Sequence, residues 1–203
     1  MATNVYIDGF NLYYGAVKNT PYRWLDLSKL CKLLLPHDQI NGIKYFTAKV
    51  KALPQDPGQP MRQQTYLRAL ATIPNVEIFY GRFVSHKIWM PRADGSGFVE
   101  VIKAEEKGSD VALAVHLLHD AHLDDCETAV VISNDTDLIP AIRIVRDQLG
   151  KKVGLLCPHK RMSKSLVSEV AFCKKIREGV LQASQFPSLL RDAVGEFEKP
   201  QDW

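Results

Sequence analysis

The stretch that decides the fold is Thr128-Ala129-Val130-Val131-Ile132, followed directly by Ser133-Asn134-Asp135-Thr136-Asp137. Residues 128–132 are an unbroken run of β-branched and apolar residues without alternation. Such a run is typical of a central strand in a parallel sheet, because both faces of that strand are buried. Two carboxylates follow at the C-terminal end of the strand, where open α/β sheets bind their ligands. The stretch therefore predicts a ligand site at one edge of a parallel sheet.

Strand and helix patterns alternate on both sides of this stretch. Further strands are predicted over 4–7, 43–48, 76–80, 153–156 and 171–173, and helices over 25–35, 61–72, 111–121, 137–149 and 163–170. This alternation implies right-handed crossovers between parallel strands. The predicted fold class is α/β, with three α/β/α layers around a mostly parallel central sheet.

The segment from about 82 to 103 breaks the alternation. Two β-type runs, 88–90 and 98–101, flank the turn sequence Ala93-Asp94-Gly95-Ser96-Gly97. We interpret this segment as an inserted β-hairpin. Residues 1–186 then form a single domain, and 187–203 form a C-terminal tail that we expect to be loosely held.

Composition narrows the class of protein. The chain has 203 residues, of which 46% are hydrophobic and 24% charged, as expected of one globular domain. Its formal charge of +3 fits a nucleic-acid partner without demanding one. No apolar run reaches the roughly 18 residues of a membrane helix, and no signal peptide is recognised, so we expect a cytoplasmic protein. Its scattered cysteines suggest reduced core thiols: Cys31, Cys126, Cys157 and Cys173.

Aspartates occur at strand ends and at a helix start, namely at Asp8, Asp110, Asp135 and Asp137. If the strands over 4–7 and 128–132 are neighbours, all of these carboxylates converge at one edge of the sheet. Clustered carboxylates repel one another unless a cation lies among them. Carboxylate oxygens suit Mg²⁺ or Mn²⁺, and the spacing does not resemble an EF-hand loop.

Each of these side chains also has a structural interpretation. Asp110 and Asp137 could cap helices, and Asp8 could form an Asx-type turn. Asn11 is well placed as a helix N-cap. If the cap lies at Asp137, Asp135 has no evident structural role. The pair Asp8 and Asp135 is therefore the sharpest candidate for the metal.

Three motifs, taken together and in order, resemble those of the NYN-domain family: Ile7-Asp8-Gly9-Phe10-Asn11-Leu12, Lys107-Gly108-Ser109-Asp110-Val111 and Ser133-Asn134-Asp135-Thr136-Asp137-Leu138. These are PIN-like ribonucleases with a FLAP-nuclease-like fold. The resemblance covers roughly 4–158 and extends to 161–184. It implies one or two Mg²⁺ or Mn²⁺ ions at a site of Asp8, Asp110, Asp135 and Asp137, supported by Asn11. The family more often has a glycine where this chain has Asn134.

The resemblance implies metal-assisted hydrolysis of phosphodiester bonds, endonucleolytic and on single-stranded RNA. An alternative is an RNA-binding or regulatory module that keeps an inactive acidic pocket. A third interpretation, a phosphatase for small phosphate esters, is weak. Such enzymes carry Asp-x-Asp after their first strand, whereas here Phe10 occupies the second aspartate position.

Basic residues suggest where RNA would bind. The run 151–177 holds eight Lys and Arg against one acid, Glu169. Lys107 is either a phosphate contact or an ion-pair partner of a nearby acid. Glu106 either contributes a carboxylate to the site or is a solvated neighbour of Lys107, and we favour the second interpretation. The residues predicted to bind RNA are Lys107, Lys151, Lys152, Lys160, Arg161 and Lys164.

Two aromatic residues of the hairpin, Trp89 and Phe98, have several interpretations. They could stack on bases, pack within the hairpin or form a homodimer interface. The histidines at 116, 119 and 122 have near-helical spacing. We interpret them as an exposed helix face rather than a zinc site.

Overall fold

The computed structural model describes residues 2–201 and 203; Met1 and Asp202, which belong to the predicted domain and tail, lie outside the described residues. Its centre is a seven-stranded sheet in the order β4-β3-β2-β1-β5-β6-β7. Only the β3–β4 pair is antiparallel. The strands are β1 (Ala2–Asp8), β2 (Gln39–Ala48), β3 (Val76–Pro91), β4 (Phe98–Lys107), β5 (Thr128–Ile132), β6 (Lys152–Cys157) and β7 (Phe172–Lys175). The predicted α/β class is confirmed.

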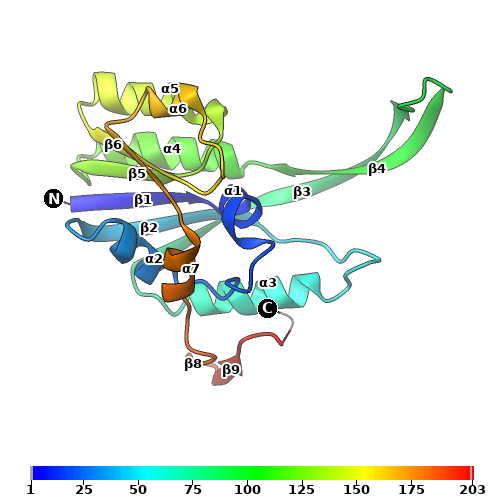
Figure 1. Ribbon diagram of the computed structural model, residues 1–203, viewed down its shortest axis with the longest axis horizontal. Helices are drawn as coiled ribbons and strands as arrows, with labels where there is room; N and C mark the ends of the chain where they lie inside the picture. The colour runs from blue at the N-terminus through cyan, green and yellow to red at the C-terminus, as the bar shows by residue number, and fades with distance from the viewer. Residues whose placement is uncertain (1, 202) are drawn as a thin grey trace.

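Helices cover both faces of this sheet, giving three layers (Figure 1). One face packs against α1 (Gly9–Leu12), the π-helical turn η1 (Tyr13–Val17), α2 (Leu27–Leu34), α3 (Gln59–Leu70) and α7 (Glu178–Ala183). The other packs against α4 (Ser109–His122), η2 (Thr136–Leu138), α5 (Ile139–Arg143), η3 (Ile144–Gln148) and α6 (Lys164–Val167). Within the described residues, no helix has the length and apolar character needed to cross a membrane.

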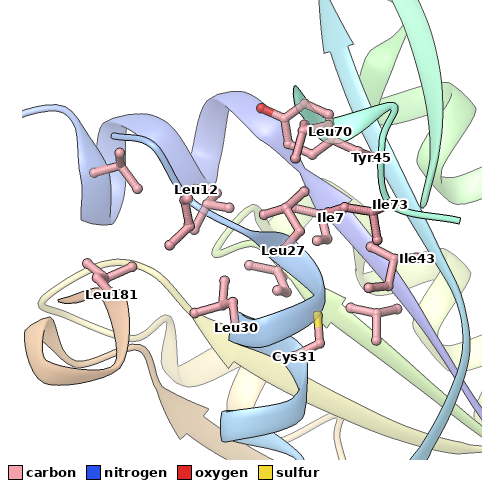
Figure 2. Packing of buried hydrophobic residues seen from close by; sticks show 14 of the residues in the cluster. Ile7, Leu12, Leu27, Leu30, Cys31, Ile43, Tyr45, Leu70, Ile73 and Leu181 are labelled. Carbon is pink, nitrogen blue, oxygen red and sulfur yellow. The ribbon is translucent and has the colours of Figure 1, made fainter. Parts of the chain in front are cut away.

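Alternation along the central strands divides the core into two clusters. On one face, Ile7 of β1 packs with Leu30 of α2 and Leu70 of α3, as Figure 2 shows. On the other, Tyr6 and Val131 pack against Leu113 of α4. Because successive strand residues point to opposite faces, a strand covered on both sides must be apolar throughout. This explains why β5, the stretch that decides the fold, shows no alternation.

The register of β1 against β5 positions the site. The two strands are parallel neighbours, with Ile7 opposite Ile132. Asp8 and Ser133 therefore leave the sheet side by side at its carboxyl edge. The predicted adjacency of these two strands is confirmed.

A hairpin lies where one was predicted, between the third strand and the following helix; it spans 82–107, slightly longer than the predicted 82–103, and its first strand continues β3. β3 continues without interruption for 16 residues, and β4 pairs with its outer half from Phe98 to Lys107. Figure 1 shows this two-stranded arm projecting away from the body. Trp89 and Phe98 are each 67% exposed. They therefore do not pack inside the hairpin.

The helix predicted over 137–149 is confirmed as one continuous helical run, which begins as the 3-10 turn η2, continues as α5 and ends as the π-helical turn η3. One other expectation was wrong. The tail is not loosely held in its described part, because β8 (Leu189–Arg191) and β9 (Glu196–Glu198) form a small second sheet. Arg68 donates to both carboxylate oxygens of Asp192, at 2.6 and 2.7 Å. The sequence did not reveal this anchoring, since its partners lie on distant α3.

Candidate active site

Asp8 joins the ends of β1 and β5. Its Oδ1 accepts the backbone N–H of Asn11 at 2.9 Å and caps α1, while its Oδ2 accepts the hydroxyl of Ser133 at 3.0 Å. Asp8, not Asn11, is therefore the cap of the first helix. Asn11 lies inside α1, and its side-chain oxygen accepts the N–H of Asn134 at 3.0 Å. These bonds fix the two motifs relative to each other.

Asp135 also has a structural role, contrary to expectation. Its Oδ1 accepts the N–H of Asp137 at 3.0 Å and caps the short helix η2. An aspartate readily reaches the backbone two residues ahead, so the cap falls at Asp135, two residues before the predicted Asp137. Asp137 is exposed on the first turn of η2. The prediction gave the capping role to Asp137 and none to Asp135, whereas the structure gives the capping role to Asp135.

The second motif, together with Glu106 just before it, brings two acids to the same edge. Gly108 has a φ of 101°, a left-handed conformation that favours glycine, and it turns the end of β4 into α4. Asp110 then lies in the first turn of α4. Glu106 accepts both the N–H and the hydroxyl of Ser109, at 3.2 and 2.6 Å. The interpretation of Glu106 as merely a solvated neighbour is wrong, because Glu106 lines the same pocket as Asp110.

We call this hollow the acid pocket. Among the described residues, its lining contains four carboxylates and no lysine or arginine. The carboxylates are those of Asp8, Glu106, Asp110 and Asp135, and the remaining walls come from Phe10, Asn11, Tyr14, Phe83, Ser109 and His159. Asp137 is not part of the lining. The structure thus brings three of the four predicted aspartates together, with Asn11 beside them.

Electrostatic repulsion follows from this arrangement. Burial raises the pKa of Asp8, and the hydrogen bonds from Asn11 and Ser133 offset part of that rise. Partial burial, together with the charges of Asp8 and Asp135, raises the pKa of Asp110 to about 6. The pocket therefore disfavours its own full ionisation in the absence of a cation.

The donor set suits a hard cation, although no closed cage is preformed. Among the described residues, no three Asp, Glu, His or Cys side chains are already gathered closely enough to hold an ion. No hydrogen bond to the Asp110 carboxylate is found there either, and Asp135 uses only Oδ1. Mg²⁺ keeps several waters and often binds through one or two carboxylates. Asp110 and Asp135 could hold such an ion, with Asp8 as a fixed wall.

His159 is a pocket residue that sequence reasoning missed. It follows β6, and its imidazole lies against the backbone of Gly15 in η1, where an added Cβ would come within 2.7 Å of the ring. No local sequence pattern predicts this contact, because residues 15 and 159 are far apart in the sequence and are brought together only by the fold. A histidine thus supplies the one titratable nitrogen in the described lining.

Asn134 adds contacts that a glycine could not make. Its side-chain oxygen accepts the N–H of Ser163 at 2.8 Å, and its side-chain nitrogen donates to the carbonyl of Arg161 at 3.2 Å. Asn134 does not have a positive φ. The turn thus needs no glycine, and the side chain ties the third motif to the segment after β6.

The basic residues predicted to bind RNA fall into separate groups. Lys160, Arg161 and Lys164 follow β6 at the same edge as the acid pocket. Lys151 and Lys152 lie at the opposite end of β6, where Lys152 pairs with Thr128, roughly 16 Å from the carboxyl edge at the rise of a strand. Lys151 forms an ion pair with Asp124.

Lys107 forms an ion pair with Glu105 at 2.9 Å rather than with an acid of the pocket. Of the two roles weighed for this residue, the structure thus supplies an ion-pair partner on its own strand. No contact of Lys107 with the acid pocket is found among the described residues.

Comparisons with known proteins agree with the fold. The NYN domain family model matches residues 2–174. The chain is 31% identical to 6-hydroxy-3-succinoylpyridine 3-monooxygenase of Pseudomonas putida, over 100% of this chain and 75% of that protein. A crystal structure of a protein of unknown function from Vibrio parahaemolyticus, 18% identical, covers 87% of this chain and 93% of its own with a TM-score of 0.58. The chain therefore belongs to the NYN domain family.

Proposed function

We propose that this protein is a metal-dependent ribonuclease that hydrolyses phosphodiester bonds within single-stranded RNA. The observation that carries the proposal is the acid pocket, whose described lining has four carboxylates and no lysine or arginine. Membership of the NYN family, whose fold is PIN-like, supports a nuclease. Unpaired like charges are costly to gather in one hollow, so a function that uses a cation there accounts for them.

Mg²⁺ or Mn²⁺ is the proposed cofactor, held by Asp110 and Asp135, with Asp8 and Glu106 close by. Bound there, one or two ions would make an attacking water more acidic and would offset charge on the phosphate. The chain's own contribution is orientation. Asp8 is held from both sides by Asn11 and Ser133, so its carboxylate faces the pocket in one fixed position.

Cleavage assays test this proposal. Labelled single-stranded RNA is incubated with the wild type and with Asp135→Asn, in Mg²⁺, in Mn²⁺ and in EDTA. Asparagine keeps the side-chain oxygen that caps η2 but removes the charge, so the variant should fold. We expect metal-dependent cleavage that the variant loses.

Cleavage that persists in Asp135→Asn would contradict the assigned role of that residue. RNA binding without any cleavage by the wild type would instead favour the RNA-binding module with an inactive pocket.

A second candidate function rests on a different hollow, next to α1. Aromatic side chains of Tyr13, Tyr45, Tyr66 and Trp203 line it, and its Arg62 is ion-paired with Asp56 of the same lining. Such an aromatic lining suits a small planar ring. The Pseudomonas putida relative is named for a substituted pyridine that carries a succinoyl group.

Thermal denaturation in the presence of 6-hydroxy-3-succinoylpyridine tests this second candidate. An increase in Tm that Tyr66→Ala removes would favour small-molecule binding. The absence of any increase at millimolar ligand would reject it.

A further inference from the structure

A second charged hollow lies directly beside the acid pocket. It is formed by the end of η1, the segment that follows β6 and the start of α7. We call this hollow the basic groove. The cations of its lining are Lys18, Lys160, Lys175 and Arg177. The lining contains one carboxylate, that of Glu178. The groove therefore has an excess of positive charge.

These cations are not engaged in ion pairs. Among residues 2–201 and 203, none of the four forms a salt bridge with a carboxylate, whereas Arg143, Arg146 and Lys151 elsewhere all do. Lys175 donates to the backbone carbonyl of Lys160 at 3.1 Å, a contact that leaves its charge uncompensated. Unpaired cations that converge on a concave surface favour a polyanion.

Tyr14 separates the groove from the acid pocket. It lines both hollows and is 56% exposed. The Lys18 ammonium lies 4.8 Å from the centre of its ring, and Phe10 stacks on it at 6.5 Å. On the opposite wall the chain passes from groove to pocket within two residues, since Pro158 and Lys160 line the groove and His159 lines the pocket. A supported aromatic ring between two charged hollows suits an unpaired base.

We infer that the basic groove binds a phosphate of a single-stranded polynucleotide, with the adjoining base stacked on Tyr14. The position of that phosphate relative to the bond that is cleaved rests on the proposed function. The binding itself does not. Double-stranded RNA is disfavoured, because paired bases are not available to stack on a side chain at the surface.

Fluorescence anisotropy with the full-length Asp135→Asn protein tests this inference without cleaving the probe. The probes are a labelled single-stranded RNA and the duplex of the same sequence, and inorganic phosphate serves as a competitor. The groove variant is Lys160→Gln/Lys175→Gln. The matched control is Lys151→Gln/Lys152→Gln, which removes the same charge at the opposite end of β6.

We expect the groove variant to weaken single-strand binding about tenfold, and the slope of log Kd against log salt to fall by roughly 0.7 per lost phosphate contact. The control should change Kd by less than about threefold, because it lies far from the groove. Tyr14→Ala should also weaken binding about tenfold, whereas Tyr14→Phe should retain it. Unchanged Tm values verify that the variants are folded.

Equal losses in the groove and control variants would overturn the inference, as would equal affinity for the duplex. Displacement of the RNA by low-millimolar inorganic phosphate would also overturn it, since the groove would then be a simple phosphate site. With Asp135 restored, cleavage by Lys160→Gln/Lys175→Gln that stays normal at RNA concentrations below the wild-type Kd rejects the inference and leaves the proposed nuclease intact. Groove-dependent binding without cleavage by the wild type rejects the nuclease and supports the inference.

Discussion

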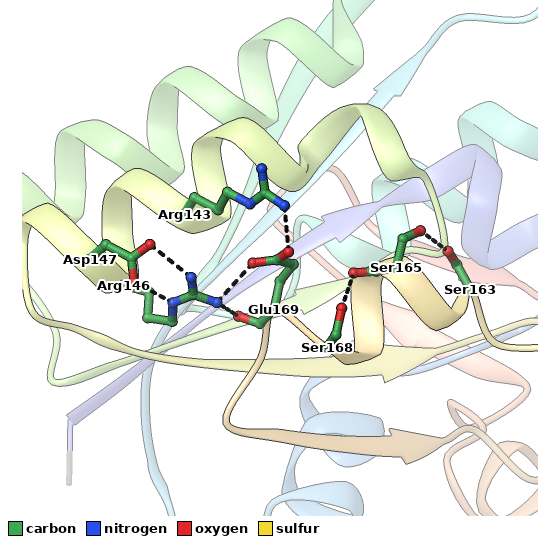
Figure 3. Close-up of polar contacts among 7 residues, drawn as sticks. All are labelled: Arg143, Arg146, Asp147, Ser163, Ser165, Ser168 and Glu169. Carbon is green, nitrogen blue, oxygen red and sulfur yellow. Dashed lines mark hydrogen bonds and ion pairs between the residues drawn. The ribbon is translucent and has the colours of Figure 1, made fainter.

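The carboxylates of one charged region of this protein are paired with arginines, whereas those of the acid pocket are not paired with any lysine or arginine of its described lining. Where α5 and η3 meet the turn after α6, Glu169 accepts Arg143 at 2.6 Å and Arg146 at 2.9 Å, and Arg146 also pairs with Asp147 (Figure 3). The two arginines hold the pKa of Glu169 below its usual range. In the acid pocket, burial and neighbouring acids raise the pKa of Asp110 to about 6.

The difference separates a structural charge cluster from a functional one. Arginine and carboxylate charges in the first cluster balance, so the folded protein is complete without any ligand there. The acid pocket concentrates like charge that nothing in its described lining offsets. Perturbed carboxylates of this kind, located in a hollow at the carboxyl edge of a parallel sheet, are typical of functional sites.

Activity should distinguish the two regions most strongly. We expect Asp135→Asn to lower metal-dependent cleavage by about 100-fold or more, because it removes a carboxylate from the metal site. Glu169→Gln should leave cleavage within about twofold, since Glu169 lies outside the pocket. Initial rates on one labelled RNA measure both effects. A comparable loss of cleavage in the two variants would contradict the assignment of the acid pocket, and not the Glu169 cluster, as the functional site.

Removing a charge from the acid pocket should stabilise the folded protein instead of destabilising it. We expect Asp110→Asn to raise the Tm of the metal-free protein at pH 7 by about 2 °C, after allowance for solvent screening, because Asp110 is only partly buried. The amide removes a charge that its neighbours repel. Differential scanning calorimetry in EDTA measures the change. Added Mn²⁺ should stabilise the wild type more than the variant.

The pH dependence of this gain follows from the direction of the pKa shift. The Asp110 pKa is raised from 3.8 to about 6, so the folded state binds more protons than the unfolded state between these values. Wild-type stability therefore falls as the pH rises through this window. The Tm difference between Asp110→Asn and the wild type should be near zero at pH 4 and complete above pH 7. A constant difference across this range would argue against the repulsion.

The smallest effect is expected at the paired cluster. Glu169→Gln should lower Tm by no more than about 2 °C, because the Arg143 and Arg146 side chains of its salt bridges are 58% and 36% exposed and pairs screened by solvent stabilise little. High salt should reduce the effect further. Thermal denaturation at 0.05 and 1 M NaCl measures this. A larger loss that salt does not alter would mean that Glu169 stabilises the fold through packing instead.

The sheet could be predicted because its information is local. The apolar run at residues 128–132 is β5 itself, with the same bounds, and the parallel pairing with β1 follows from the alternation of strands and helices. The basic run 151–177 misled for a physical reason. Residues at the two ends of one strand are close in sequence but lie at opposite edges of the sheet, so Lys151 and Lys160 cannot share a site.

The site could be predicted only in part. Its aspartates follow from strand ends, but capping depends on the local backbone, and this is why Asp135 rather than Asp137 caps η2. Glu106 enters the pocket because β4 continues to Lys107 before the turn at Gly108. His159 enters through a contact between segments that are distant in sequence. No pattern in a single sequence predicts that Glu106 and His159 line the pocket.

Anomalous diffraction from a crystal soaked in Mn²⁺ tests the central claim most directly, because it locates the ion independently of any reaction. We predict an anomalous peak within coordination distance of the Asp110 and Asp135 carboxylates, absent from crystals of Asp135→Asn. An acid pocket open to solvent that shows no peak at saturating Mn²⁺ would contradict the account.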